Sequence, residues 1–174
     1  MERFTFKGLF AVIGLYLATL TGCSFDTDSS GTTPSGADAP PLLVAKDFNF
    51  DNIKPTEEYF REVRYAEIDM KNGEILANSC LACHTFGQGE KHGLGPNIFG
   101  FFGQPAARHM DFSYSEALQE SGIIWTPEVL EAWLALPSRF LPGTIMPFAG
   151  FKSETDRRDL VGFLMLETNN IVNK

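Results

Sequence analysis

The run Cys80-Leu81-Ala82-Cys83-His84 combines residue types and a spacing that could do redox chemistry. The C-x-x-C-H spacing is typical of covalent attachment of a c-type haem, in which two thiols form thioethers with the haem vinyl groups. The histidine that follows then lies beneath the iron, so His84 is the candidate for one axial ligand. The sequence therefore predicts one covalently bound haem c.

Two other interpretations use the same cysteines. A structural zinc site needs two more clustered ligands, and the remaining candidates are His92, His109 and the distant Cys23. A thioredoxin-like dithiol expects a preceding buried strand, whereas residues 66–79 have a helical pattern and a Gly-rich loop follows. The context favours haem.

A second axial ligand is expected in the segment 142–148, which contains Met146 between prolines and a glycine. A neutral thioether favours ferrous iron and gives a six-coordinate, high-potential carrier. Most methionines fill gaps in a core, but this one lies in a loop. The competing candidates are Met110, in a polar loop, and Met165, in the last predicted helix.

The N-terminal sequence has the pattern of an export signal. Arg3 and Lys7 precede an apolar or small stretch over residues 8–20, which is too short to span a bilayer comfortably. Residues 20–23 resemble a bacterial lipobox, and Cys23 is the one cysteine left after two haem thioethers. We therefore expect a lipoprotein signal peptide over residues 1–22, with Cys23 acylated. An uncleaved anchor is the alternative.

Two segments separate Cys23 from the predicted haem domain, residues 65–174. Residues 24–41 are rich in Ser, Thr, Gly, Asp, Ala and Pro and predict a disordered tether. Residues 42–64 are too apolar for a pure linker, and a short helix is expected from residue 56 or 57 onward. The domain itself should be all-α, with three to five helices wrapped around the haem. The expected helices are 66 or 72 to 80, 113–119, 127–136, and one from residue 153 or 154 onward.

A set of short segments, spread over residues 73–169, matches one known family. They are Cys80 to Thr85, Lys91-His92, Gly95-Pro96-Asn97, Gly100, Phe112-Ser113-Tyr114, Gly122-Ile123, Trp125, Pro142-Gly143-Thr144, Met146, Phe148-Ala149-Gly150 and Arg158-Asp159-Leu160. In these the chain resembles the class I cytochromes c, in the branch of mitochondrial cytochrome c and bacterial cytochrome c2.

That resemblance implies a role for eight residues at the cofactor. It implies His84 and Met146 as axial ligands of the iron and Cys80 and Cys83 as thioether sites. The Pro96 carbonyl would accept a hydrogen bond from the His84 ring. Three more residues, Tyr114, Trp125 and Thr144, would lie near the haem propionates; buried propionates need such donors. His92 matches a histidine that joins loops by hydrogen bonds.

Three departures from the family pattern concern haem tuning. Gln104 stands where the mitochondrial proteins carry an Arg beside a propionate, so one positive charge is missing. Trp133 replaces a Tyr behind the Met ligand, and Leu118 replaces an Asn. We expect these two changes to weaken the hydrogen bonding there and leave the Met sulfur in a more apolar setting.

The chain is acidic, with a formal net charge of −8. Removal of residues 1–22 leaves 21 acidic and 12 basic side chains, a net charge of −9 before haem. Ile145 occupies a usual Lys position, so steering by a basic face is weak, and nucleic-acid binding is disfavoured. An alternative is that the acidity lies on the far side, leaving a neutral face of Phe101, Phe102 and Phe148 around the haem edge.

Taken together, these features predict a lipid-anchored, periplasmic, monomeric carrier of single electrons rather than an enzyme. The likeness to cytochrome c2 implies a bc1-type donor and a terminal oxidase or photosynthetic reaction centre as acceptor, in a respiratory or photosynthetic chain. A dedicated haem subunit of a periplasmic dehydrogenase or oxidase stays open, as does a ligand-binding or peroxidatic haem protein.

Overall fold

The computed structural model describes residues 42–169. The predicted signal peptide, the lipidation site Cys23 and the tether over residues 24–41 lie outside the described residues. The described part is helical and contains no strand; its β-type pairing is one isolated bridge between Pro105 and Ile124. The all-α prediction is therefore confirmed.

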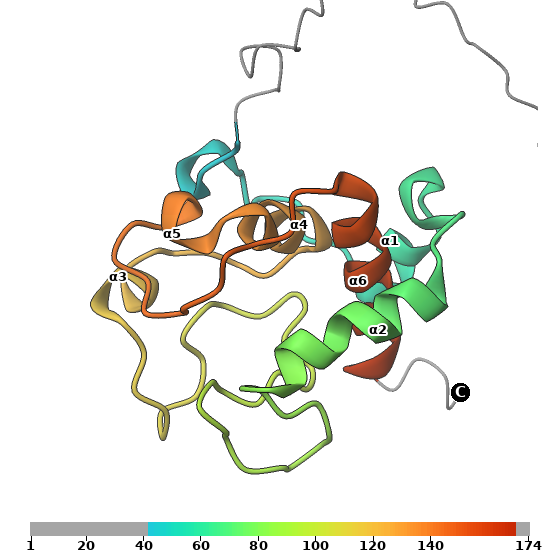
Figure 1. The fold of residues 1–174 in the computed structure, drawn as a ribbon. Helices are drawn as coiled ribbons and strands as arrows, with labels where there is room; N and C mark the ends of the chain where they lie inside the picture. The colour runs from blue at the N-terminus through green and yellow to red at the C-terminus, as the bar shows by residue number, and fades with distance from the viewer. Residues whose placement is uncertain (1–41, 170–174) are drawn as a thin grey trace, which may run out of the picture. The chain divides into compact units, whose positions relative to one another are not determined.

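Six α-helices follow one another along the described chain (Figure 1). They are α1 (Thr56–Phe60), α2 (Met70–Leu81), α3 (Glu116–Gln119), α4 (Pro127–Ala135), α5 (Pro137–Phe140) and α6 (Glu154–Glu167). Two short 3-10 helices, Ala45–Asp47 and Val63–Tyr65, flank α1. Five of the α-helices, α2 to α6, fall in the predicted haem domain, as expected. None of the helices in the described part is long and apolar enough to cross a bilayer.

Capping side chains fix where four of these helices begin. The side-chain oxygens of Asp69, Ser115, Thr126 and Ser153 each accept a backbone N–H from the first turn of the helix that follows. Pro127 occupies the first turn of α4, where its missing N–H costs nothing. The predicted starts at residue 127 and at 153 or 154 agree with α4 and α6, whereas those at 66 or 72 and at 113 differ from the starts of α2 and α3 by two to four residues.

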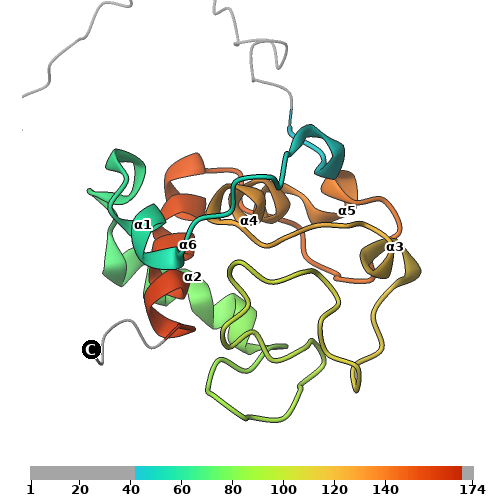
Figure 2. The same cartoon turned by 180° about the vertical axis from the view of Figure 1, so that it is seen from behind.

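Helices α2 and α6 cross closely, as both ribbon views show (Figures 1 and 2). At the crossing, a Cβ on Gly73 would lie 2.4 Å from the Asp159 carbonyl oxygen and 2.7 Å from Phe163 Cβ. Only glycine lets the two backbones approach this far. Helix α4 also packs against α6. The apolar face of α6 lies in the core, where its residues Leu160, Val161, Leu164 and Met165 are each at most 2% exposed.

The segment 42–65 packs onto the domain. Phe48 contacts Phe140 with ring centroids 5.8 Å apart, and Tyr59 and Tyr65 are 6% and 1% exposed. The expected short helix is present as α1. Burial of these aromatic rings stabilises the attachment, since each removes a large apolar area from water.

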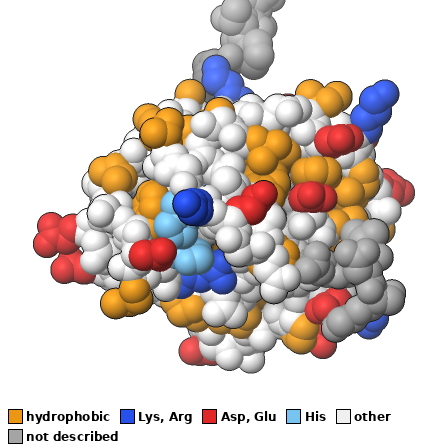
Figure 3. Space-filling model, turned by 90° about the horizontal axis from the view of Figure 1, so that it is seen from below, with side chains coloured by type: hydrophobic (Ala, Val, Ile, Leu, Met, Phe, Trp, Pro, Cys, Tyr) orange, Lys and Arg blue, Asp and Glu red, His pale blue; other side chains and the backbone are white. Residues whose placement is uncertain are grey.

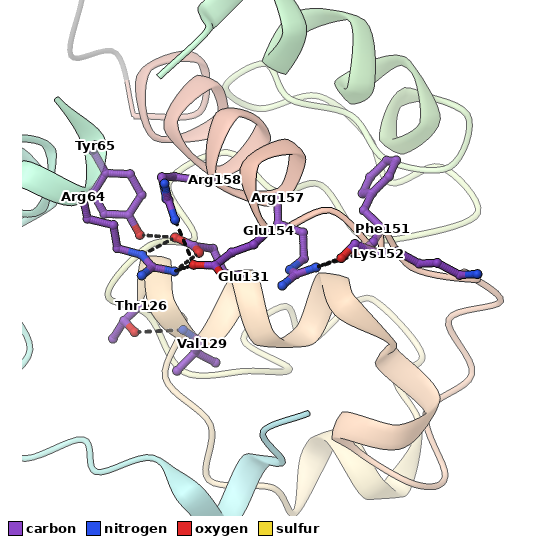
Figure 4. Close-up of polar contacts among 10 residues, drawn as sticks. All are labelled: Arg64, Tyr65, Thr126, Val129, Glu131, Phe151, Lys152, Glu154, Arg157 and Arg158. Atoms are coloured by element: carbon purple, nitrogen blue, oxygen red, sulfur yellow. Dashed lines mark hydrogen bonds and ion pairs between the residues drawn. The ribbon is translucent and has the colours of Figure 1, made fainter. Parts of the chain in front are cut away.

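An ion pair fixes the end of that segment to α4 (Figure 4). Glu131, only 4% exposed, accepts hydrogen bonds from Arg64 Nε at 3.0 Å, from Arg64 Nη2, and from the Tyr65 hydroxyl at 2.7 Å. Burial and the adjacent carboxylate raise the pKa of Tyr65, so its phenol stays a donor. We call Arg64, Tyr65 and Glu131 the N-terminal clamp.

Helix α5 differs from the prediction, which ended the preceding helix at Pro137 and began no other there. Leu136 adopts an extended conformation, with φ −168° and ψ 92°, and Pro137 then occupies the first turn of a new helix. Proline thus ends one helix and begins the next, because its fixed φ suits a first turn.

Candidate functional site

The eight residues predicted to hold the cofactor all line one cavity of about 510 Å³. They are Cys80, Cys83, His84, Pro96, Tyr114, Trp125, Thr144 and Met146. Among the described residues, no Asp or Glu lines it, and most other lining side chains are apolar. A cavity of this size and polarity falls in the range of cofactor sites, roughly 300–1,000 Å³.

Helix α2 and the turn after it present the attachment motif to the cavity. The backbone N–H groups of Cys83 and His84 both bond to the Cys80 carbonyl, at 3.0 and 2.8 Å, which closes the turn. Burial raises the pKa of the Cys80 thiol to about 11. Neither cysteine belongs to a group of three potential metal ligands within residues 42–169, which disfavours the zinc alternative there.

The His84 ring is fixed by the loop over residues 93–97. Its Nδ1 lies 2.7 Å from the Pro96 carbonyl oxygen, so Nδ1–H donates and Nε2 keeps its lone pair. Burial lowers the pKa of His84, which keeps the imidazole neutral. A Cβ on residue 95 would lie 2.5 Å from His84 Cε1, so Gly95 leaves room for this ring position. The hydrogen bond implied by the resemblance is present.

Met146 lies in the loop between α5 and α6 and is the one methionine of the described part that lines the cavity. Its backbone N–H donates to Thr144 Oγ1 at 3.3 Å, which shapes the turn before it. Met110 is 99% exposed, and Met165 is fully buried in α6; neither lines the cavity. The geometry therefore favours Met146 over both competing candidates.

The prediction that the Met146 sulfur lacks a hydrogen-bond donor and lies in a more apolar setting is wrong. Trp133 Nε1–H donates a hydrogen bond to Met146 Sδ across 3.3 Å. The replacement of Tyr by Trp keeps a donor, because the indole N–H projects into the cavity from α4. Leu118 does line the cavity without offering a polar group, as the sequence indicates.

Three predicted propionate neighbours come from separate elements. Tyr114 precedes α3, Trp125 precedes α4, and Thr144 lies in the loop that carries Met146. Both aromatic side chains are half-buried at the cavity wall, with the pKa of Tyr114 raised by burial. They can present O–H and N–H donors to an anionic group while their rings remain in apolar surroundings.

Arg108 is a cavity residue that the sequence reasoning missed. Its guanidinium donates to the Gly100 carbonyl at 2.9 Å and to the Phe99 carbonyl. The sequence signal was the loss of the family Arg at Gln104, which is exposed here and does not line the cavity. Arg108, four residues later, does line the cavity and places a positive charge there.

His92, His109 and Asp111 form a second polar group, with one ligand atom from each within 4.8 Å of the others. Figure 3 shows histidine side chains at the surface beside charged ones. His92 Nδ1 accepts the Asn97 N–H at 2.9 Å, so its Nε2 carries the proton that faces Asp111 at 3.1 Å. A metal ion would need that occupied nitrogen, so the group joins loops, consistent with the role implied for His92.

Exposed apolar side chains lie at the cavity, although not the three phenylalanines that the neutral-face alternative names. Phe101 and Phe102 are each 6% exposed and belong to the core, and Phe148 is half-buried. Two other cavity residues carry the exposed apolar area, Leu94 at 85% and Ile145 at 67%. The exposed large apolar side chains at the cavity are therefore Leu94 and Ile145 rather than the three phenylalanines.

These residues fit a covalently bound haem. The cavity brings together two thiols, an oriented imidazole, a thioether sulfur and a cationic wall, and its glycine leaves space where a side chain would enter the ligand ring. This combination of groups suits a planar, apolar macrocycle with anionic propionates.

The chain is similar to several curated cytochromes, whereas no family model matches it. It is 39% identical over 105 residues to a cytochrome c of Stellaria longipes, covering 60% of this chain and 97% of that protein. It is 40% identical over 96 residues to a cytochrome c2 of Blastochloris viridis, covering 55% and 76%. With a cytochrome c of Theileria annulata it shares 40% over 94 residues, covering 54% and 81%.

Proposed function

The chain belongs to the class I cytochromes c, and on that basis we propose that it is a membrane-tethered carrier of single electrons on the periplasmic side of a bacterial membrane. Its proposed donor is a bc1-type complex, and its acceptor is a terminal oxidase or a photosynthetic reaction centre. The family transfers electrons with one covalent haem c. When bound, this haem supplies a one-electron iron couple that exchanges electrons with partners through an exposed edge.

Cys80 and Cys83 are the proposed thioether sites, and His84 and Met146 are the proposed axial ligands. The observation that carries this assignment is that all four residues line one cavity. His84 Nδ1–H donates to the Pro96 carbonyl, which leaves the Nε2 lone pair able to bind a metal. Two fixed ligands favour electron transfer, because the coordination changes little between the ferric and ferrous states.

The basic side chains of the cavity hold loop carbonyls by hydrogen bonds and are not placed for acid–base catalysis. Arg108 donates to the carbonyls of residues 99 and 100, and His109 Nε2 donates to the Asn97 carbonyl at 2.9 Å. Tyr114, Trp125 and Thr144 are proposed to hold the propionates. This arrangement supports a carrier over a peroxidatic haem protein, which needs an acid–base side chain beside an open iron position.

An optical spectrum of the haem-loaded protein tests the ligand assignment. We expect a Met-to-iron charge-transfer band in the ferric state and no spectral change when carbon monoxide is added to the ferrous state. A Met146→Ala variant should lose the band and bind carbon monoxide. Ready carbon monoxide binding by the unaltered protein would instead contradict the carrier assignment.

The lipid anchor is proposed from the sequence around Cys23, where a short apolar stretch and a lipobox-like run precede the cysteine. Two or three acyl chains would hold the chain at a membrane, because one chain alone gives only marginal binding. Fractionation of cells that express the chain and its Cys23→Ser variant tests this. We expect membrane association of the first only; equal distribution of both would contradict it.

A further inference from the structure

Two exposed leucines begin the described part of the chain. Leu42 is 37% exposed and Leu43 is 51% exposed, and they are the exposed large apolar side chains of residues 42–169 that adjoin in sequence. The next two residues, Val44 and Ala45, are half-buried, so the chain turns inward directly after the pair. Two adjacent apolar side chains in water are stabilised when a second surface covers them.

The start of this segment is held against α5. The 3-10 helix Ala45–Asp47 lies beside α5 in both ribbon views (Figures 1 and 2). Directly after it, Phe48 contacts the ring of Phe140, which is 2% exposed, with centroids 5.8 Å apart. The exposed leucines therefore project from a fixed place on the domain, next to α5.

Two basic side chains belong to the elements that this contact joins. Lys46 in the 3-10 helix and Arg139 in α5 are both exposed, and neither forms an ion pair with another described residue. The carboxylate of Asp47 is engaged within its own turn, because its Oδ2 accepts the Val44 N–H at 2.9 Å. A chain with a formal net charge of −8 thus places two cations at the end of the domain that carries the exposed leucines.

We propose that Leu42, Leu43, Lys46 and Arg139, here called the α5 corner, dock onto a bilayer surface that contains anionic lipids. The inference rests on the proposed function, in which Cys23 is acylated. Apolar side chains combined with basic ones suit the boundary between headgroups and acyl chains. The 19 residue steps from Cys23 to residue 42 span at most about 65 Å, so the anchor keeps the corner at high local concentration beside the bilayer, and a small contact suffices.

Docking of the α5 corner would orient the haem cavity. Ile145, an exposed residue of the cavity, follows the end of α5 by five residues, a chain distance of at most about 18 Å. The same edge of the cavity is then held near the bilayer in every docked molecule. A partner embedded in that membrane meets one orientation of the carrier instead of all of them.

The reaction rate of an introduced thiol with a neutral maleimide tests the contact on the acylated, haem-loaded chain in vesicles. Cys80 and Cys83 then carry the haem and Cys23 the lipid, so the new cysteine is the reactive thiol. Leu43→Cys probes the corner, and Val63→Cys, in the same segment and 91% exposed at the native Val, is the control. We expect phosphatidylglycerol-containing vesicles, compared with pure phosphatidylcholine ones, to slow Leu43→Cys at least about fivefold and to leave Val63→Cys unchanged. Equal rates for Leu43→Cys in both vesicles would overturn the docking.

Charge reversal tests the basic residues. Adding Lys46→Glu and Arg139→Glu to the Leu43→Cys chain should restore the fast reaction, because each cation at an anionic surface strengthens binding about fivefold. Arg61→Glu with Lys71→Glu is the matched control, since these exposed residues change the net charge equally and lie outside the corner. Equal effects of the two pairs would overturn the role of the corner. Failure of the unaltered chain to sediment with either kind of vesicle would instead overturn the lipid anchor of the proposed function.

Discussion

Replacement of Tyr65 by Phe should destabilise the fold by removing one bond of the N-terminal clamp. The Tyr65 hydroxyl donates to Glu131 Oε1 at 2.7 Å, and both residues are almost completely buried. A hydrogen bond to a charged partner contributes about 1.5–3 kcal/mol. Because Arg64 still bonds to both carboxylate oxygens, Glu131 keeps a partner in the variant. We therefore expect a loss near the lower bound, about 1.5–2 kcal/mol of unfolding free energy.

Urea unfolding of the haem-loaded chain, followed by circular dichroism at neutral pH, measures this loss. Tyr59→Phe is the matched control, because Tyr59 is also buried in the N-terminal segment but accepts only the Lys54 backbone N–H, at 3.3 Å. A long bond between neutral groups should be worth about 0.5 kcal/mol. If Tyr65→Phe costs no more than Tyr59→Phe, the reasoning about the clamp is refuted.

Three further outcomes are expected. Arg108→Gln should lower the reduction potential by roughly 40 mV, or about 1 kcal/mol, because a cation at the cavity disfavours ferric haem. Redox titration measures this, and Arg108→Lys should keep a potential close to that of the unaltered protein. Equal potentials in the unaltered protein and both variants would contradict the prediction. Burial, with a contribution from Arg108, lowers the pKa of His109, so the unfolded chain binds more protons below about pH 6.5 and stability falls there. His109→Gln can keep the bond to the Asn97 carbonyl and should lose less stability between pH 7.5 and 5.5 in urea titrations; the same loss in both proteins would rule out His109 as the cause. Gly95→Ala would place a Cβ 2.5 Å from His84 Cε1 and force the imidazole ring away from Pro96. We expect the free energy of unfolding to fall by about 2–3 kcal/mol, measured by thermal unfolding. An unchanged unfolding midpoint would argue against that close contact.

The helix boundaries could be predicted where a single side chain sets them. Thr126 and Ser153 cap the helices that the sequence places after them, and Pro127 marks a first turn. Helix α5 could not be predicted in this way, because Pro137 reads equally as the end of one helix and the start of the next. Which reading applies depends on the extended conformation of Leu136.

The residues of the cofactor site also fall into two groups, those that the sequence predicts and those that only the structure shows. Covalent attachment requires a fixed local spacing, so Cys80, Cys83 and His84 are visible in the sequence. Contacts that depend on how loops and helices meet are not, and so Arg108 and the bond from Trp133 to Met146 emerged only from the structure. In the first case the fold supplies the charge from another position, Arg108 instead of residue 104; in the second, the substituted residue Trp133 is itself the donor.

The N-terminal clamp also limits how far the haem domain can travel. With Cys23 as the proposed anchor, 19 residue steps separate the lipid from residue 42, where the described segment begins. Fully extended, these 19 steps span at most about 65 Å. If residues 42–65 were detached from the domain, the 42 steps from Cys23 to Tyr65 would span roughly 145 Å. The volume open to the domain is then about tenfold smaller, and the local concentration of the carrier at a neighbouring complex is correspondingly higher. The N-terminal clamp and the packed rings of Phe48 and Tyr59, none of which lines the haem cavity, would thereby set the frequency of productive encounters.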